Sequence, residues 1–180
     1  ERLVPYAVQW SGGVEDMRLR IRIPGARTTR VAEAVTREVR LIFGLDFDLP
    51  GFYRFAKADP ALVGLLEPLY GLRPSLAAGG LEMLVGSITA QQVNLAFALS
   101  LRARVVRRYG RAVRMGDGTV YAFPDASALA SARLRDLRAL KFSTRKAEYI
   151  RDVARAVDSG ALDFATLAAA PNGRVIDTLT

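Results

Sequence analysis

Cysteine and histidine are both absent from the 180-residue sequence. Without cysteine, these residues form no disulfide, thiolate nucleophile, zinc–thiolate site or iron–sulfur cluster. Without histidine, they form no Ser-His-Asp triad and few of the usual transition-metal sites. Any chemistry within this stretch must therefore use carboxylates, hydroxyls, lysine or a bound water.

Long hydrophobic runs are also missing. No apolar run approaches the roughly 18 residues of a membrane-spanning helix, and no secretory signal is visible. The first residue is Glu1 rather than an initiator methionine, so we expect the chain to begin inside a longer protein. Hydrophobic residues at 51% and charged residues at 24% favour a globular domain over a disordered chain.

Lysine is scarce, whereas arginine is abundant. The three lysines are Lys57, Lys141 and Lys146, and the formal net charge is +8 with a pI of about 10.4. A basic domain attracts polyanions, of which nucleic acid is the commonest. The alternative is an arginine-rich composition whose charge only solvates the surface, and composition alone does not decide between the two.

The N-terminal part predicts a small α+β layer. Residues 3–10 and 17–23 alternate apolar and polar side chains around a Ser-Gly-Gly turn, a pattern typical of a β-hairpin. One face of the second strand carries three arginines, Arg18, Arg20 and Arg22. That face is either the solvated side of the sheet or a phosphate-binding surface. Helical spacing predicts a helix over 29–43 that ends at Gly44.

From residue 59 onward the pattern becomes helical. Asp59 and Pro60 are typical of a helix start, and Gly71 of a helix end. Between them we expect a buried leucine stripe: Leu62, Leu65, Leu66 and Leu69. An irregular link precedes a helix over 81–89, and two glutamines then interrupt the hydrophobic pattern.

Asn94 is a good N-cap for the next helix, which should end at Gly110. The side chains expected to be buried on it are Leu95, Ala98, Leu99, Val105 and Val106. Four arginines near its end should share one face: Arg104, Arg107, Arg108 and Arg111. A short connection that is either polar or hairpin-like is expected at 111–122.

Three further helical stretches follow. One opens at Asp125, one over 132–140 is capped by Ser131 or a neighbour, and one over 144–158 is capped by Ser143. The turn before the last helix carries four polar or charged residues: Lys141, Ser143, Arg145 and Lys146. Backbone N–H groups at a helix start, flanked by cations, can seat a phosphate. A solvated turn is the alternative.

Two segments resemble the bacterial 3-methyladenine DNA glycosylase II group of helix-hairpin-helix DNA glycosylases. They are LEMLVGSITAQQVNLAFALSLRARVVRRYG and FPDASALASARLRDLRALKFSTRKAEYIRDVARAV. The family's G-Q-Q/L-V-S-like turn reads Ala90-Gln91-Gln92-Val93-Asn94 here, with alanine for glycine and asparagine for serine. The family's second motif is intact at residues 145–149, and the resemblance extends back through 44–74.

The resemblance implies an α+β fold. A partial N-terminal antiparallel β-sheet and helix layer, residues 1–50, would pack on an all-α glycosylase domain, residues 51–180, that lacks the helix-hairpin-helix. The family's catalytic aspartate follows that hairpin, so we expect it beyond Thr180 and assign no catalytic residue in this chain. Asp177 would belong to the helix leading into the hairpin. We therefore expect a fragment trimmed at both ends, which binds DNA at best and excises no base.

In such glycosylases, the turn formed by the first motif enters the minor groove and fills the gap left by a flipped-out nucleotide. Flipping costs a few kcal/mol of stacking and pairing, and an inserted side chain offsets part of that cost. The resemblance makes Gln92 this plug, while Gln91 would hold the backbone of the turn or contact the flanking strand. An ordinary exposed surface turn is the alternative. The remaining expected DNA-binding residues are Asn94, Lys141, Ser143, Arg145 and Lys146.

The implied activity is hydrolytic removal of alkylated purines such as 3-methyladenine from double-stranded DNA. The implied protein is a bacterial, cytoplasmic and nucleoid-associated monomer that needs no cofactor, metal or membrane. Trp10 and Tyr6 either contribute to a base pocket or pack in the core. Two other classes stay open: a non-catalytic basic DNA-binding module or regulator, and a helical interaction domain whose charge is incidental.

Overall fold

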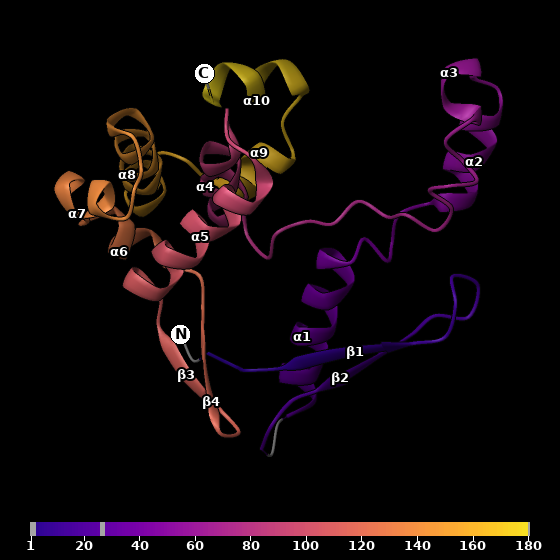
Figure 1. The fold of residues 1–180 in the computed structure, drawn as a ribbon, viewed down its shortest axis with the longest axis horizontal. Helices are drawn as coiled ribbons and strands as arrows, with labels where there is room; N and C mark the ends of the chain where they lie inside the picture. The colour runs from indigo at the N-terminus through magenta and orange to yellow at the C-terminus, as the bar shows by residue number, and fades with distance from the viewer. Residues whose placement is uncertain (1–2, 26–27, 180) are drawn as a thin grey trace. The chain divides into compact units, whose positions relative to one another are not determined.

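The computed structural model describes residues 3–25 and 28–179, which form two compact units within residues 1–78 and 79–180. Each unit contains helices and one two-stranded antiparallel sheet (Figure 1). This mixture confirms the expected α+β class. The domain boundary predicted near residue 50 concerns the organisation of the whole protein and stays a prediction.

The first unit begins with the predicted hairpin. Its elements are β1 (Ala7–Ser11), β2 (Arg18–Arg22), α1 (Thr29–Ile42), α2 (Leu49–Lys57) and α3 (Pro60–Val63). The strands pair with Ala7 opposite Arg22 and Ser11 opposite Arg18. Just before β1, the Tyr6 hydroxyl donates to Glu38 Oε1 at 2.7 Å and so ties this segment to α1.

Helix α1 follows the sequence prediction closely. It starts after Thr28, whose side chain accepts a hydrogen bond from the Val31 N–H, and it buries Val35 and Val39. It ends at Gly44, where φ is +58° and a Cβ would lie 2.3 Å from the carbonyl oxygen of Pro74. Both the left-handed backbone and the close approach require glycine at this position.

The prediction for residues 44–71 was wrong in two respects. Helix α2 was missed, although Asp48 caps it by accepting from the Gly51 N–H at 3.0 Å. Helix α3 has only four residues, and turns follow it up to Gly71. Leu65 and Leu69, expected to be buried, are 51% and 48% exposed. The physical reason lies in Gly64, a poor helix former, and in Pro68, which lacks the N–H that a helix interior needs.

The second unit contains one hairpin and seven helices within its described residues. They are α4 (Gly80–Ala90), α5 (Leu95–Tyr109), β3 (Ala112–Met115), β4 (Gly118–Tyr121), α6 (Ala126–Ala130), α7 (Leu134–Ala139), α8 (Thr144–Asp158), α9 (Phe164–Ala168) and α10 (Asn172–Leu179). Strands β3 and β4 pair with Ala112 opposite Tyr121, which confirms the hairpin-like connection. None of the helices in residues 3–25 and 28–179 combines the length and apolarity of a membrane span.

Helices α4 to α8 share one core. Its central side chains are Val85, Leu101, Val105, Leu129, Leu137, Phe142, Ala147 and Ile150. On α5 the buried face was predicted only in part, because Ala98 and Val105 are buried but Leu95 and Leu99 are 73% and 56% exposed. Leu101 takes the central position instead. Apolar residues lie on more than one side of this helix, so its spacing could not identify the face that packs.

The caps of α6, α7 and α8 were predicted with one error, and the cap of α9 at Asp163 was not predicted. Asp125 Oδ1 accepts from the Ala128 N–H at 3.0 Å at the start of α6. Ser143 Oγ accepts from the Lys146 N–H at 3.3 Å at the start of α8. Ser131, expected to cap the helix between them, instead ends α6 and donates to the Ser127 carbonyl. Helix α7 begins after Arg133, without a side-chain cap.

Candidate nucleic-acid interface

The glutamine turn connects α4 to α5. Gln91 and Gln92 are both exposed, so their amides are available to an external partner. Gln92 has a left-handed backbone with φ +54°. Asn94 is the N-cap of α5, and its Oδ1 accepts from the Phe97 N–H at 2.9 Å. The asparagine that replaces the family's serine therefore caps the helix as expected, while the two glutamines lie outside the core.

The second turn connects α7 to α8. Lys141 is exposed and left-handed, with φ +78°, and the next residue, Phe142, is buried in the core. Ser143 caps α8, whose first turn reads Thr-Arg-Lys-Ala. Arg145 is exposed there, close to the N–H groups that begin the helix. The turn thus combines an aromatic anchor with exposed cations and helix N–H groups, the features of a phosphate-binding site.

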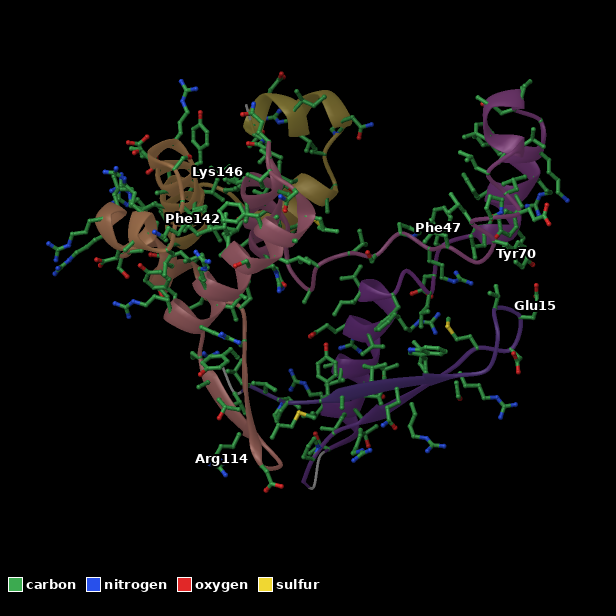
Figure 2. All side chains as sticks on the ribbon, viewed as in Figure 1. Glu15, Phe47, Tyr70, Arg114, Phe142 and Lys146 are labelled. Atoms are coloured by element: carbon green, nitrogen blue, oxygen red, sulfur yellow. The ribbon has the colours of Figure 1, made fainter. Side chains whose placement is uncertain are left out.

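One side chain joins the two turns. Lys146 Nζ donates to the Thr89 carbonyl at 2.9 Å and to the Gln91 carbonyl at 2.7 Å. Gln91 and Lys146 are 55 residues apart in the sequence. Figure 2 labels Lys146 and Phe142 in this part of the second unit. The fold therefore brings the two motifs together, which the sequence predicted only as separate segments.

Both turns contain unusual backbone. Among the described residues, Gln92 and Lys141 are the two non-glycine residues with a left-handed conformation. For an L-residue this conformation costs about 1–2 kcal/mol. Such strain persists where the surrounding structure holds it, and it often marks functional sites. The backbone strain therefore lies in the same two turns that the sequence motifs predict to contact DNA.

The arginines of α5 do not all face solvent together. Arg104 Nη1 donates to the Leu140 carbonyl at 3.2 Å, so this side chain contacts the second turn. Arg107 and Arg108 are exposed, and Arg108 lies over the Tyr109 ring at 5.5 Å. Arg104 is half-buried and bonded to a backbone carbonyl, so it does not project into solvent with Arg107 and Arg108 as expected.

Other candidate residues lie outside these turns. Arg18, Arg20 and Arg22 are exposed on β2, which is compatible with either reading of that face. Trp10 is 73% exposed, so the core-packing alternative for it is wrong. Asp177 is exposed on α10. Among the described residues, no three His, Cys, Asp or Glu side chains gather as metal ligands.

Titratable groups near the helix starts serve local structure. Hydrogen bonds from the Ala128 N–H and the Ser127 hydroxyl lower the pKa of the Asp125 carboxyl. Bonds from the Thr166 hydroxyl and from backbone N–H groups lower the pKa of Asp163, which caps α9. Both carboxylates are therefore ionised caps.

At the end of α5, burial, with a smaller contribution from Asp136, raises the pKa of the Tyr109 hydroxyl.

Residues 85–177 match the family model described as HhH-GPD superfamily base excision DNA repair protein. The chain belongs to this superfamily. The matched residues include both turns, Gln91 to Asn94 and Lys141 to Ser143, and most of the core that supports them. The family model and the juxtaposed turns thus identify the same part of the second unit.

Two proteins similar to this chain are named as 3-methyladenine DNA glycosylases. The chain is 35% identical over 130 residues to a DNA-3-methyladenine glycosylase of Bacillus subtilis (strain 168), a match that covers 72% of this chain and 43% of the relative. The structure is similar to 3-methyladenine DNA-glycosylase from Archaeoglobus fulgidus, with a TM-score of 0.68 and 32% identity over 83% of this chain and 51% of that one.

A third comparison concerns the fold. Clostridium acetobutylicum 8-oxoguanine glycosylase/lyase, solved with double-stranded DNA containing cytosine opposite 8-oxoG, has a TM-score of 0.78 at 16% identity. That match covers 96% of this chain and 56% of the other. The chain therefore spans about half the length of the relatives it matches.

Proposed function

We propose that the whole protein is a DNA glycosylase of base excision repair that flips out and hydrolytically removes alkylated purines such as 3-methyladenine. The sequence identities to the Bacillus subtilis and Archaeoglobus fulgidus proteins support this substrate class. The single observation that carries the proposal is the joining of the two turns in the second unit. The proposed partner is double-stranded DNA with a damaged base, bound by a cytoplasmic, nucleoid-associated monomer without a cofactor.

The glutamine turn would fill the gap in the duplex. Gln92 is exposed at the tip of the turn, and its amide carries both donors and an acceptor for the orphaned base. Gln91 would support the turn or contact the flanking strand, and Asn94 would fix the start of α5. An inserted side chain offsets part of the cost of unstacking and unpairing the extruded nucleotide.

The second turn would bind the phosphate backbone. Lys141 and Arg145 are exposed cations two residues before and two residues after Ser143, the N-cap of α8, and Arg145 belongs to the first turn of that helix. Phosphate contacts of this kind supply affinity and orientation but little sequence information. Lys146 stays in the proposed DNA-binding site, but its ammonium group contacts the backbone carbonyls of Thr89 and Gln91 and so would act through the glutamine turn.

The chemical step needs a carboxylate that stabilises the developing positive charge on the sugar. We assign no catalytic residue among these 180 residues, because Asp125 and Asp163 act as helix caps and Asp177 lies on the exposed side of α10. We therefore expect the 180-residue chain to bind DNA without releasing a base. Release of alkylated bases by this chain would contradict that expectation.

Binding to a duplex with an abasic analogue tests the plug. Gln92→Ala should weaken this binding about tenfold, which corresponds to about 1.4 kcal/mol, and should affect undamaged duplex less. Gln9→Ala is the matched control, because Gln9 is an exposed glutamine of β1 outside the site. Equal affinities of wild type and Gln92→Ala for the abasic duplex would exclude the plug.

Salt dependence tests the phosphate contacts. The logarithm of affinity should fall with the logarithm of salt concentration by about 0.9 per neutralised phosphate. A flat response would favour the interaction domain with incidental charge. Duplex binding by the complete protein without any base release would favour the non-catalytic DNA-binding module.

A further inference from the structure

We infer that Lys146 and Arg104 are positioning residues, which hold the two turns in their left-handed conformations rather than binding phosphate. The importance of the turns for DNA rests on the proposed function. The contacts themselves belong to the free protein and can be tested without DNA.

The two turns are held in the same way. The carbonyl directly before the left-handed Gln92 accepts from Lys146 Nζ at 2.7 Å. The carbonyl directly before the left-handed Lys141, that of Leu140, accepts from Arg104 Nη1 at 3.2 Å. Lys146 comes from α8, which follows the second turn, and Arg104 from α5, which follows the first. Each turn is therefore held by a cation from the helix that follows the other turn.

Lys146 also completes the end of α4. The last carbonyls of a helix lack partners within the helix and carry the negative end of its dipole. Lys146 donates to one of these, the Thr89 carbonyl, at 2.9 Å. Thr89 is buried, and its hydroxyl donates to the Val85 carbonyl one turn earlier at 2.6 Å. The ammonium group thus attaches the exposed turn to a buried part of α4.

The position of Lys146 is unfavourable for its own helix. It lies in the first turn of α8, at the positive end of the helix dipole, and it follows another cation, Arg145. Its backbone N–H donates to the N-cap residue Ser143. A cation there contradicts the local preference for acidic residues at helix starts. Its contacts with the carbonyls of Thr89 and Gln91 explain the exception, because they compensate for that local cost.

The charged atoms of Lys146 and Arg104 are already engaged with backbone oxygens, and both side chains are only partly accessible. Lys141 and Arg145 are exposed by contrast. Left-handed backbone is intrinsically unfavourable for a non-glycine residue, so without Lys146 we expect Gln92 to leave this conformation in part of the molecules. The turn would then have the conformation that binds DNA in only a fraction of the molecules. The apparent affinity for DNA would be reduced in proportion to that fraction.

Salt titrations of duplex affinity separate positioning from phosphate binding. We expect Lys146→Met to weaken binding to the abasic duplex about tenfold at every salt concentration, with the salt slope unchanged. Lys141→Met is the matched control at an exposed lysine, and its slope should fall by about 0.9. A similar fall in slope for Lys146→Met would overturn the inference. Lys146→Arg should retain the slope and restore part of the affinity, and it provides the same test if Lys146→Met does not fold.

A double-mutant cycle tests whether Lys146 acts through Gln92. If Lys146 acts by holding the turn, Gln92→Ala should cost much less affinity in the Lys146→Met background than in the wild type. Fully additive losses would contradict this. A lysine that only stabilises the fold would give additive losses, so the cycle distinguishes positioning from general stabilisation.

Backbone NMR shifts of the free protein test the contacts without DNA. Lys146→Met should move the signals of Gln91, Gln92 and Val93, and Arg104→Met those of Lys141 and Phe142. Arg107→Met is the matched control on the exposed side of α5 and should leave both turns unchanged. Unchanged turn signals in the first two variants would overturn the inference. If the wild type binds no DNA, the proposed function fails, yet these spectra still decide whether the two cations hold the turns.

Discussion

The two units use left-handed backbone differently. In the first unit, the described residues with positive φ are all glycines: Gly12, Gly25, Gly44 and Gly71. In the second unit, Gly116 and Gly160 follow the same rule, but Gln92 and Lys141 do not. The second unit therefore contains backbone strain at two exposed turns. In the described part of the first unit, left-handed backbone occurs only at glycine, which adopts it without strain.

The cores of the two units also differ. Helices α4 to α8 share a continuous set of buried side chains, and Phe142 of that core directly follows Lys141. Among the described residues, the first unit buries fewer apolar side chains, namely Val35, Val39, Leu49 and Ala56. A strained conformation survives only where its surroundings over-determine it. The comparison indicates that a well-packed core supports the turns proposed to contact DNA.

Matched leucine substitutions should give the largest difference between the units. Leu129 of α6 is fully buried, and Leu72 of the first unit is 64% exposed. Leu129→Ala should lower the free energy of unfolding by about 2–5 kcal/mol, because it removes buried surface and leaves a cavity. Leu72→Ala should change it by at most about 0.5 kcal/mol. Chemical denaturation measures both, and equal losses would contradict the contrast in packing.

Matched glycine substitutions should have opposite signs. Gly44→Ala places a Cβ 2.3 Å from the Pro74 carbonyl oxygen at a left-handed residue, so we expect a loss of about 2–3 kcal/mol. A Cβ at Gly86, inside α4, meets open space, and Gly86→Ala should add about 0.5–1 kcal/mol. Thermal unfolding checks the signs. Tolerance of Gly44→Ala would show that the first unit also sustains strain.

Lys141→Gly should raise stability and weaken DNA binding. Glycine removes the cost of the left-handed conformation, about 1 kcal/mol, and also removes an exposed cation of the proposed site. Lys57→Gly is the matched control at the end of α2, where the same change should cost up to about 1 kcal/mol. Denaturation and duplex titration provide the two measurements. A loss of stability in Lys141→Gly would contradict the strain in the second unit.

Tyr109→Phe should have the smallest effect, a gain of at most about 1 kcal/mol. The Tyr109 hydroxyl is buried and has no hydrogen-bond partner among the described residues, and burial raises its pKa. Because burial disfavours the ionised phenolate, stability does not change with the titration of this group below its ordinary pKa of 10.0, and it falls as the pH rises above that value. Unfolding measured from pH 8 to 11 should therefore show less alkaline destabilisation in the variant than in the wild type.

Local signals were reliable where one residue decides the structure. Asn94 and Ser143 cap their helices because their side chains accept the N–H three residues ahead, and Gly44 ends α1 because only glycine suits its backbone. Ser131 shows the limit of this reasoning. A serine can bond at either end of a helix, and here packing of Leu129 and Ala132 makes it the end of α6.

The sequence by itself determined the starts of α1, α3, α5, α6 and α8, the first hairpin, the exposed glutamine pair and the family, because these depend on neighbouring residues or on short motifs. Only the tertiary structure decided which face of α5 is buried and which atoms Lys146 and Arg104 contact. A lysine in a helix start can face solvent, phosphate or a distant carbonyl with nearly equal local cost. The packing of α8 against α4 makes that choice, since it brings the ammonium group to the end of α4 and the glutamine turn.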